Sequence, residues 1–174
     1  MKTRAMLKEL LIAFAILGIC LVIHVTGMVF LGQQLVQRRE KIQQKVSFLY
    51  TSLLLITVFS IVILLHVIES CVWAAFYFGY DLFPNFETSL YFSMKSYSTV
   101  GYGDVLLSHD WRLLGTIEGI AGVLLCGLSA AFLFAIVSAI FRFRNPPAGQ
   151  TGRLKVSRNR LQMKRKALKA RLTH

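Results

Sequence analysis

The segment Ser98 to Asp104, which reads STVGYGD, has the pattern that most clearly indicates chemistry. Gly101 and Gly103 alternate in it with larger residues. A strand that aims successive main-chain carbonyl oxygens to one side needs alternating backbone conformations, some of which only glycine adopts cheaply. An ion-coordinating strand would need such a backbone, so residues 99–103 are a candidate for one.

Three long apolar runs must position this strand. They are Leu10 to Leu31, Val46 to about Ile68, and Leu113 to Phe141. As a helix the first run would be about 33 Å long, close to the hydrocarbon thickness of a bilayer. Its basic start resembles a signal peptide, but the run is long for one and lacks a small-x-small cleavage site, so we predict an uncleaved membrane helix.

The second run continues past Glu69 into an aromatic band from Trp73 to Tyr80. The whole stretch is too long to lie in lipid (roughly 50 Å), so its end should tilt, project or break near Gly79. Asn145-Pro146-Pro147 should stop the third run.

A short polar stretch from Asp81 to Asp110 separates the second and third runs. Pro84 and Asn85 indicate a turn, and Glu87 to Ser98 predicts a helix too short to span. Non-helical backbone at membrane depth is tolerated only where protein buries it or where it lines a water-filled path. The sequence thus predicts a re-entrant helix and loop.

Charge predicts how the chain lies in the membrane. The net charge is +12, and 11 of the 20 lysines and arginines follow Phe141. The basic connector at 33–45 and the basic tail should face the cytoplasm, and the acidic loop at 81–110 should lie outside. The N-terminus then lies outside too, although its basic residues favour the inside; the alternative is that the first run lies at the inner face.

The segment Thr99-Val100-Gly101-Tyr102-Gly103, with a short amphipathic helix before it and Asp104 after it, resembles the tetrameric potassium channel family over about residues 46–142. The resemblance implies an all-α membrane protein: three transmembrane helices with a re-entrant pore helix and selectivity-filter loop, forming a homotetrameric pore. It divides the chain into an N-terminal membrane helix and connector (1–45), a pore domain (46–144) and a basic cytoplasmic tail (145–174).

By this resemblance, potassium is the permeant ligand, held by the carbonyls of Thr99, Val100, Gly101 and Tyr102 and by the Thr99 hydroxyl. Tyr102 would brace the loop against pore-helix aromatics, namely Tyr91, Phe92 and Tyr97. The expected product is a multi-pass potassium channel of the cell membrane without a further cofactor. The alternative is a non-conducting or modulatory subunit of a channel assembly.

Lys95, four residues before Thr99, departs from the family pattern, which has a small, apolar or acidic residue there. A cation behind a cation filter is costly unless it is paired. We expect a pair with Asp104 or with Glu118 that supports the filter; the alternative is that Lys95 extends into an outer water pocket.

Other polar residues lie inside the apolar runs. His66 and Glu69 could sense pH, but hydrogen bonding to the pore helix is the preferred interpretation. His24 stands alone in its run, and we expect no metal there. Cys20, Cys71 and Cys126 indicate buried thiols rather than disulfides.

Gly122 matches the position at which inner helices of the family bend, with close packing as the alternative. Below it, a helical stripe predicts the cavity and gate, with Phe134 as a hydrophobic constriction. The stripe comprises Val123, Cys126, Ala130, Phe134 and Ser138.

The tail from Arg153 to Arg171 predicts either an amphipathic helix on anionic lipid or solvated chain. Its position beside a membrane span argues against nucleic acid as a partner. The chain shows no arginine ladder of a voltage sensor, no nucleotide-binding loop or EF-hand, and no nucleophile–base pair of an enzyme.

Overall fold

The computed structural model describes residues 2–37 and 47–144. Within these ranges the chain forms helices and loops and no strand, which confirms the all-α prediction. The helices are α1 (Lys2–Gln37), α3 (Phe48–Gly79), α4 (Phe86–Tyr97) and α5 (Arg112–Arg144). The chain divides into two units, residues 1–135 and 136–174, and the contacts given below lie in the first.

The three long helices correspond to the three apolar runs. Their membrane-length portions are Met6–Gln37, Phe48–Gly79 and Arg112–Arg142. The predicted boundary between the first run and the connector is wrong. Helix α1 continues to Gln37, so the polar residues from Gln33 to Gln37 belong to the helix. Glutamine is a good helix former, and it prolongs the helix beyond its apolar part.

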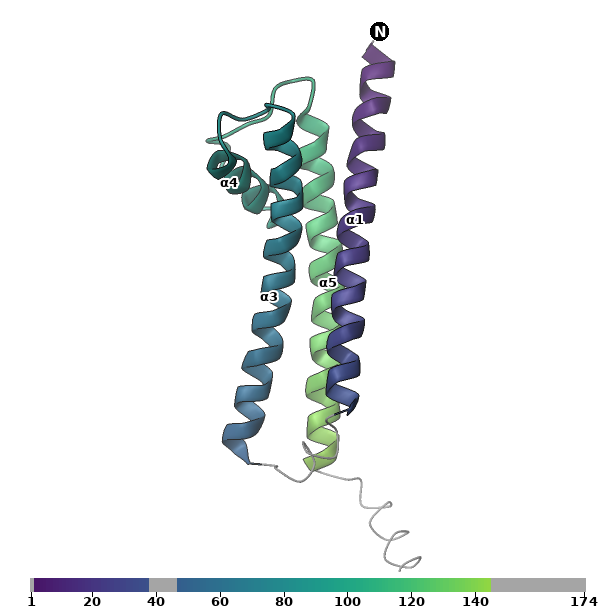
Figure 1. Cartoon of the computed structure of the whole chain (residues 1–174), viewed down its shortest axis with the longest axis vertical. Helices are drawn as coiled ribbons and strands as arrows, with labels where there is room; N and C mark the ends of the chain where they lie inside the picture. Colours follow the sequence, from purple (N-terminus) through teal and green to yellow (C-terminus); the bar gives the residue numbers. More distant parts are fainter. Residues whose placement is uncertain (1, 38–46, 145–174) are drawn as a thin grey trace, which may run out of the picture. The chain divides into compact units, whose positions relative to one another are not determined.

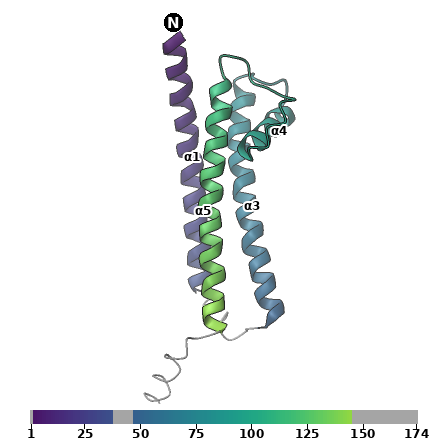
Figure 2. The ribbon, with the colours of Figure 1, turned by 180° about the vertical axis from the view of Figure 1, so that it is seen from behind.

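Helix α1 packs on α3 and begins at the same end as α5, while α3 runs in the opposite direction (Figures 1 and 2). The carboxylate of Glu9 in α1 accepts hydrogen bonds from the first backbone amides of α5, at 2.7 Å from Leu113 N and 3.2 Å from Leu114 N. Amides in the first turn of a helix have no acceptor within that helix, although the Leu114 amide also donates to the Trp111 carbonyl at 3.2 Å. The contact fixes the start of α1 beside the 81–110 loop, so α1 packs as a third long helix of the bundle.

Helix α3 ends where the sequence predicts a break. Its last residue is Gly79, and Asp81 has a positive φ of 54°. The turn returns the chain toward the bundle, because the Leu82 amide donates to the Tyr77 carbonyl at 3.0 Å. The predicted break near Gly79 is therefore confirmed.

Helix α4 is the predicted short helix, displaced by one residue. Asn85 caps its N-terminus, since its side-chain oxygen accepts from the Thr88 amide at 2.8 Å. Aromatic side chains hold α4 against α3: the rings of Tyr77 and Phe92 lie 5.2 Å apart, and those of Phe83 and Phe92 lie 5.0 Å apart. Aromatic pairs at such distances add to the stabilisation from burial.

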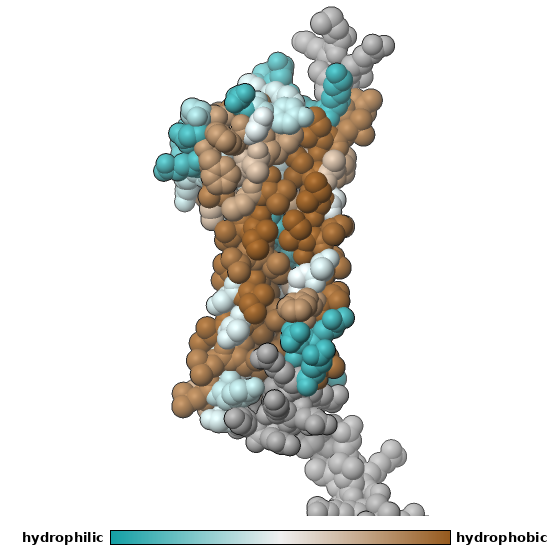
Figure 3. Space-filling view, in the orientation of Figure 1, coloured by the Kyte–Doolittle hydropathy of each residue, from teal (hydrophilic) through white to brown (hydrophobic). Residues whose placement is uncertain are grey.

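The surface of the bundle is apolar along the helices. Figure 3 shows hydrophobic side chains over the helices on this face, and hydrophilic ones gathered around the loop that carries α4. Exposed apolar side chains include Leu53, Ile56, Phe59 and Ile63 on α3. A surface of this kind is stable in lipid rather than in water.

Candidate functional site

The segment after α4 has an alternating backbone. Thr99, Gly101 and Gly103 have positive φ values of 59°, 51° and 77°, while Val100 and Tyr102 between them do not. A positive φ is unusual for a β-branched residue such as Thr99, and it is adopted only where the surroundings enforce it. The alternation is the backbone pattern that aims successive carbonyls to one side of a strand.

Lys95 holds this segment at both ends. Its carbonyl accepts from the amides of Val100 at 3.1 Å and Gly101 at 3.3 Å. Its ammonium group lies 2.5 Å from Asp104 Oδ1 and donates to the Val105 carbonyl at 3.1 Å. Of the two partners considered from the sequence, the side chain takes Asp104. The alternative, in which the Lys95 side chain extends into an outer water pocket, is wrong, because Lys95 is only 6% exposed.

Asp104 is the charged partner at the outer end of the segment. The hydrogen bond from Lys95 lowers the pKa of the Asp104 carboxyl to about 2, and a second hydrogen bond from Tyr91 acts in the same direction. The Tyr91 hydroxyl donates to Asp104 Oδ2 at 2.6 Å. That bond raises the pKa of Tyr91, because a phenol that donates to a carboxylate resists losing its proton.

Glu118 in α5 does not pair with Lys95. Its carboxylate is fully buried and accepts from Tyr77 OH at 2.7 Å and from Ser93 Oγ at 2.5 Å. Tyr77 belongs to α3 and Ser93 to α4. Glu118 therefore fastens the short helix between the two long ones.

In the single chain Tyr102 is open to its surroundings, so the bracing expected of it in a tetramer stays a prediction. Its side chain is 75% exposed, and Val100 is 50% exposed. The aromatics expected to receive Tyr102 have other partners: Tyr91 binds Asp104, Phe92 packs on Tyr77, and Tyr97 donates to Glu69. Their positions in α4 follow from contacts with distant helices, which the local spacing does not show.

Gly122 is a point of close approach. A Cβ atom there would lie 2.0 Å from the carbonyl oxygen of Tyr97, the last residue of α4. The helix continues through this position, since α5 runs from Arg112 to Arg144. The close approach supports the close-packing alternative, and the bend expected at Gly122 stays a prediction.

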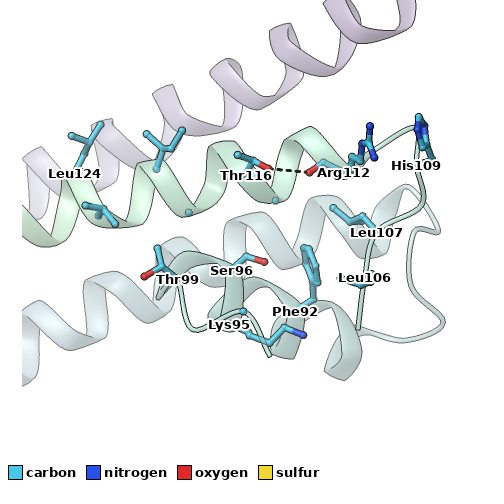
Figure 4. Close-up of a pocket in the computed structure, with 15 residues that line it drawn as sticks. Phe92, Lys95, Ser96, Thr99, Leu106, Leu107, His109, Arg112, Thr116 and Leu124 are labelled. Carbon is cyan, nitrogen blue, oxygen red and sulfur yellow. Dashed lines mark hydrogen bonds between the residues drawn. The ribbon is translucent and has the colours of Figure 1, made fainter. Parts of the chain in front are cut away.

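A groove of about 800 Å³ lies between the α4–loop unit and α5. Figure 4 shows Phe92, Lys95 and Thr99 on one side of it, and Thr116 and Leu124 of α5 on the other. Val123, which lines the groove, is 57% exposed, and Phe134 further along α5 is 74% exposed. Most of the stripe predicted for the cavity is thus a free face of the single chain, and Ser138 is partly buried.

A buried polar cluster joins all four helices beneath the loop. Glu69 accepts from Tyr97 OH, its Oε1 lies 2.7 Å from His24 Nδ1, and its Oε2 lies 3.2 Å from His66 Nδ1. Ser129 Oγ of α5 lies 3.0 Å from His66 Nε2 and 3.2 Å from His24 Nε2. The predicted bonding of His66 and Glu69 to the pore helix is confirmed, and His24, the lone histidine of its run, has partners on α3 and α5.

Sequence reasoning missed Ser129, Glu9 and the partners of His24. The available signal was that a polar side chain inside an apolar run needs a partner on another helix. Which helix supplies the partner depends on packing. The predictions for the connector at 38–46 and the tail at 145–174, including Pro146, Pro147 and the amphipathic helix, lie outside the described residues.

The three cysteines form no disulfide. Cys20 is buried as expected, Cys71 is partly buried, and Cys126 is exposed on α5. The prediction of buried thiols is therefore wrong for Cys126, because this residue belongs to the open face described above.

Three membrane-length helices, with a short helix and a non-helical loop between the last two, define a helical membrane protein with a pore-type loop. The chain belongs to the ion channel family, whose model matches residues 51–139. The match covers α4, the loop and most of α3 and α5, and it leaves out α1. Neither a curated protein nor a solved structure matches the chain.

Proposed function

We propose that this ion channel is selective for potassium, and that it conducts through a filter built from residues 99–103 of four identical chains. The observation that carries the proposal is the alternation of positive φ at Thr99, Gly101 and Gly103. Such alternation supports the proposal because it would aim main-chain oxygens, rather than charged side chains, toward an ion path. Rings of such carbonyl oxygens replace the hydration shell of potassium.

Four copies are needed because one strand cannot surround an ion. Two features of the single chain support this assembly. Tyr102 and Val100 are exposed although they are large and apolar or aromatic. The groove beside Thr99 is lined by apolar side chains of α5, such as Ile120 and Leu124. Neighbouring copies arranged around a closed symmetry axis would bury these surfaces in every chain by the same contact.

Lys95 acts in this proposal as the support of the filter. Its two carbonyl hydrogen bonds fix the inner part of the strand, and its ammonium group fixes Asp104 at the outer end. The positive charge is neutralised by Asp104, so that it does not repel ions in the filter. Glu118 supports the same unit from behind by holding Ser93.

The exposed face of α5 would line the water-filled cavity, with Phe134 as the narrowest apolar ring. An apolar constriction can close a pore by excluding water. In this arrangement Gly122 serves close packing against the base of the filter. The channel would lie in the cell membrane, with the 81–110 loop outside and the basic tail toward anionic lipid inside.

The test is cation flux through the purified full-length protein in liposomes. We expect potassium flux that exceeds sodium flux by orders of magnitude. Gly101→Ala should abolish it, since alanine resists the φ of 51° although no atom lies within 4 Å of its Cβ. Gly79→Ala is the matched control: it has equal space and no positive φ, so flux should persist.

Wild-type protein that reconstitutes as a tetramer but passes neither ion would favour the alternative, a non-conducting subunit. Equal flux of sodium and potassium would overturn the proposed selectivity. A monomer or dimer in native mass spectrometry would overturn the four-chain filter.

A further inference from the structure

The buried cluster of His24, His66, Glu69 and Tyr97 has the donor atoms and arrangement of a metal site. Possible ligand atoms of His24, His66 and Glu69 lie within 4.8 Å of one another. Two imidazoles and one carboxylate are a common set for zinc. Neither histidine belongs to the filter or to its supports, and His24 lies on α1, outside the part matched by the ion channel family.

Both rings can take the tautomer that a metal site requires. Ser129 Oγ lies within hydrogen-bond distance of Nε2 of both rings, at 3.0 and 3.2 Å. A hydroxyl oxygen has two lone pairs, so it can accept an N–H from each. With Nε2 protonated in both, each neutral ring presents the Nδ1 lone pair toward Glu69. In metal-bound histidines the ring nitrogen that does not bind the metal commonly carries a hydrogen and donates it to an acceptor in this way.

Lone pairs that face a carboxylate repel it unless a cation lies between them. His24 Nδ1 is 2.7 Å from Glu69 Oε1, and His66 Nδ1 is 3.2 Å from Oε2. Zinc ligands about 2.0–2.1 Å from the ion lie roughly 3.3 Å apart in a tetrahedron. Small side-chain shifts would therefore admit the ion, in place of the protons that otherwise bridge these atoms.

Tyr97 completes the set. Its hydroxyl oxygen lies 2.9 Å from His66 Nδ1 and donates to Glu69. The Glu69 carboxylate would offset one of the two charges of the metal, at a place where Glu69 and His24 are fully buried. The side chain of His66 is 18% exposed, which leaves an entry on that side.

We propose that His24, His66, Glu69 and Tyr97 form a site for a divalent transition metal of the zinc class. The mixed nitrogen and oxygen set suits zinc, whereas calcium and magnesium prefer all-oxygen sites. A bound ion would tie α1 and α3 to the end of α4, directly before Thr99. The site does not depend on potassium conduction, since its metal content is measured on the purified protein.

The experiment measures zinc bound to full-length protein, purified without a histidine tag, stripped with a chelator, and then given zinc chloride. We expect one zinc per chain, and at least about tenfold weaker binding for His24→Gln and for His66→Gln. His109→Gln is the matched control, because that histidine is exposed at the surface and should leave binding unchanged. Cys126→Ser should also leave it unchanged.

Zinc binding at wild-type strength in both histidine variants would overturn the site, and so would a wild-type protein that binds no zinc. Zinc binding by a variant is compared with the wild type only if the variant elutes from size-exclusion chromatography as the wild-type assembly does. If neither does, X-ray absorption on the wild type decides: only nitrogen and oxygen neighbours at about 2.0–2.1 Å support the proposal, and a sulfur neighbour contradicts it.

Discussion

Substituting Gly122 by alanine tests how the inner helix meets the filter. The added methyl group would lie 2.0 Å from the Tyr97 carbonyl oxygen and 2.8 Å from its carbonyl carbon. Both atoms are backbone, so no side chain can rotate away. Helix α5 and the end of α4 must separate until the contact reaches about 3.4 Å, the start of ordinary contact distances.

The size of the effect follows from this geometry. Forced overpacking typically costs about 1–3 kcal/mol. Tyr97 precedes Thr99 by two residues and also holds Glu69, so the displacement reaches both the filter and the buried cluster. If the cost falls on the conducting arrangement, the fraction of conducting channels falls roughly 5- to 150-fold.

The assay is potassium flux in liposomes at equal amounts of tetramer, with the unfolding temperature as a second readout. Gly127→Ala in the same helix and Gly18→Ala in α1 are the controls, because no atom lies within 4 Å of the Cβ at either position. We expect loss only for Gly122→Ala. Wild-type flux and stability in this variant would refute the close approach, and equal loss in all three would show a general intolerance of alanine.

Three further predictions concern the supports of the filter and of α5. Lys95→Met should reduce selectivity for potassium over sodium, because Asp104 loses its cation and Val105 its donor; unchanged reversal potentials would count against the support role. The folded-state pKa of Asp104 is below its ordinary value, so its pair with Lys95 contributes fully above about pH 4 and is lost as pH falls toward 2. Potassium flux should therefore not change between pH 7 and about 5 through titration of this pair. A loss of flux in that range that is seen in the wild type and is absent in Lys95→Met would contradict the assignment. Glu9→Ala should destabilise the assembly by about 0.5–2 kcal/mol, because the Leu113 amide loses its acceptor and the Leu114 amide keeps only the Trp111 carbonyl, and Glu9→Gln should cost less; equal unfolding temperatures would refute the cap.

The elements of this fold could be predicted because each has a local signal. Long apolar runs predict the three spans, and the turn at Pro84 and Asn85 predicts the start of α4. The alternating glycines predict the unusual backbone of the loop. The positive φ of Thr99 has no such signal, because its side chain does not favour that conformation and only the surrounding contacts enforce it.

Contacts between helices were predictable only in part. The choice for Lys95 was between two acids, and the structure decides it because Glu118 is already used by Tyr77 and Ser93. The partners of His24 depend on the register of α1 against α3, and apolar side chains along both helices do not specify that register. The position of Tyr102 could not be predicted from the sequence of one chain. The side chain is exposed in the single chain, so its packing depends on what covers that surface.

The measurement that tests the account most directly is the reversal potential of the purified tetramer in a planar bilayer, with potassium on one side and sodium at equal concentration on the other. Oxygens of the 99–103 backbone that fit dehydrated potassium predict a large potential, with the sign set by potassium leaving its own side. A potential near zero, with currents of similar size in both directions, would contradict the account.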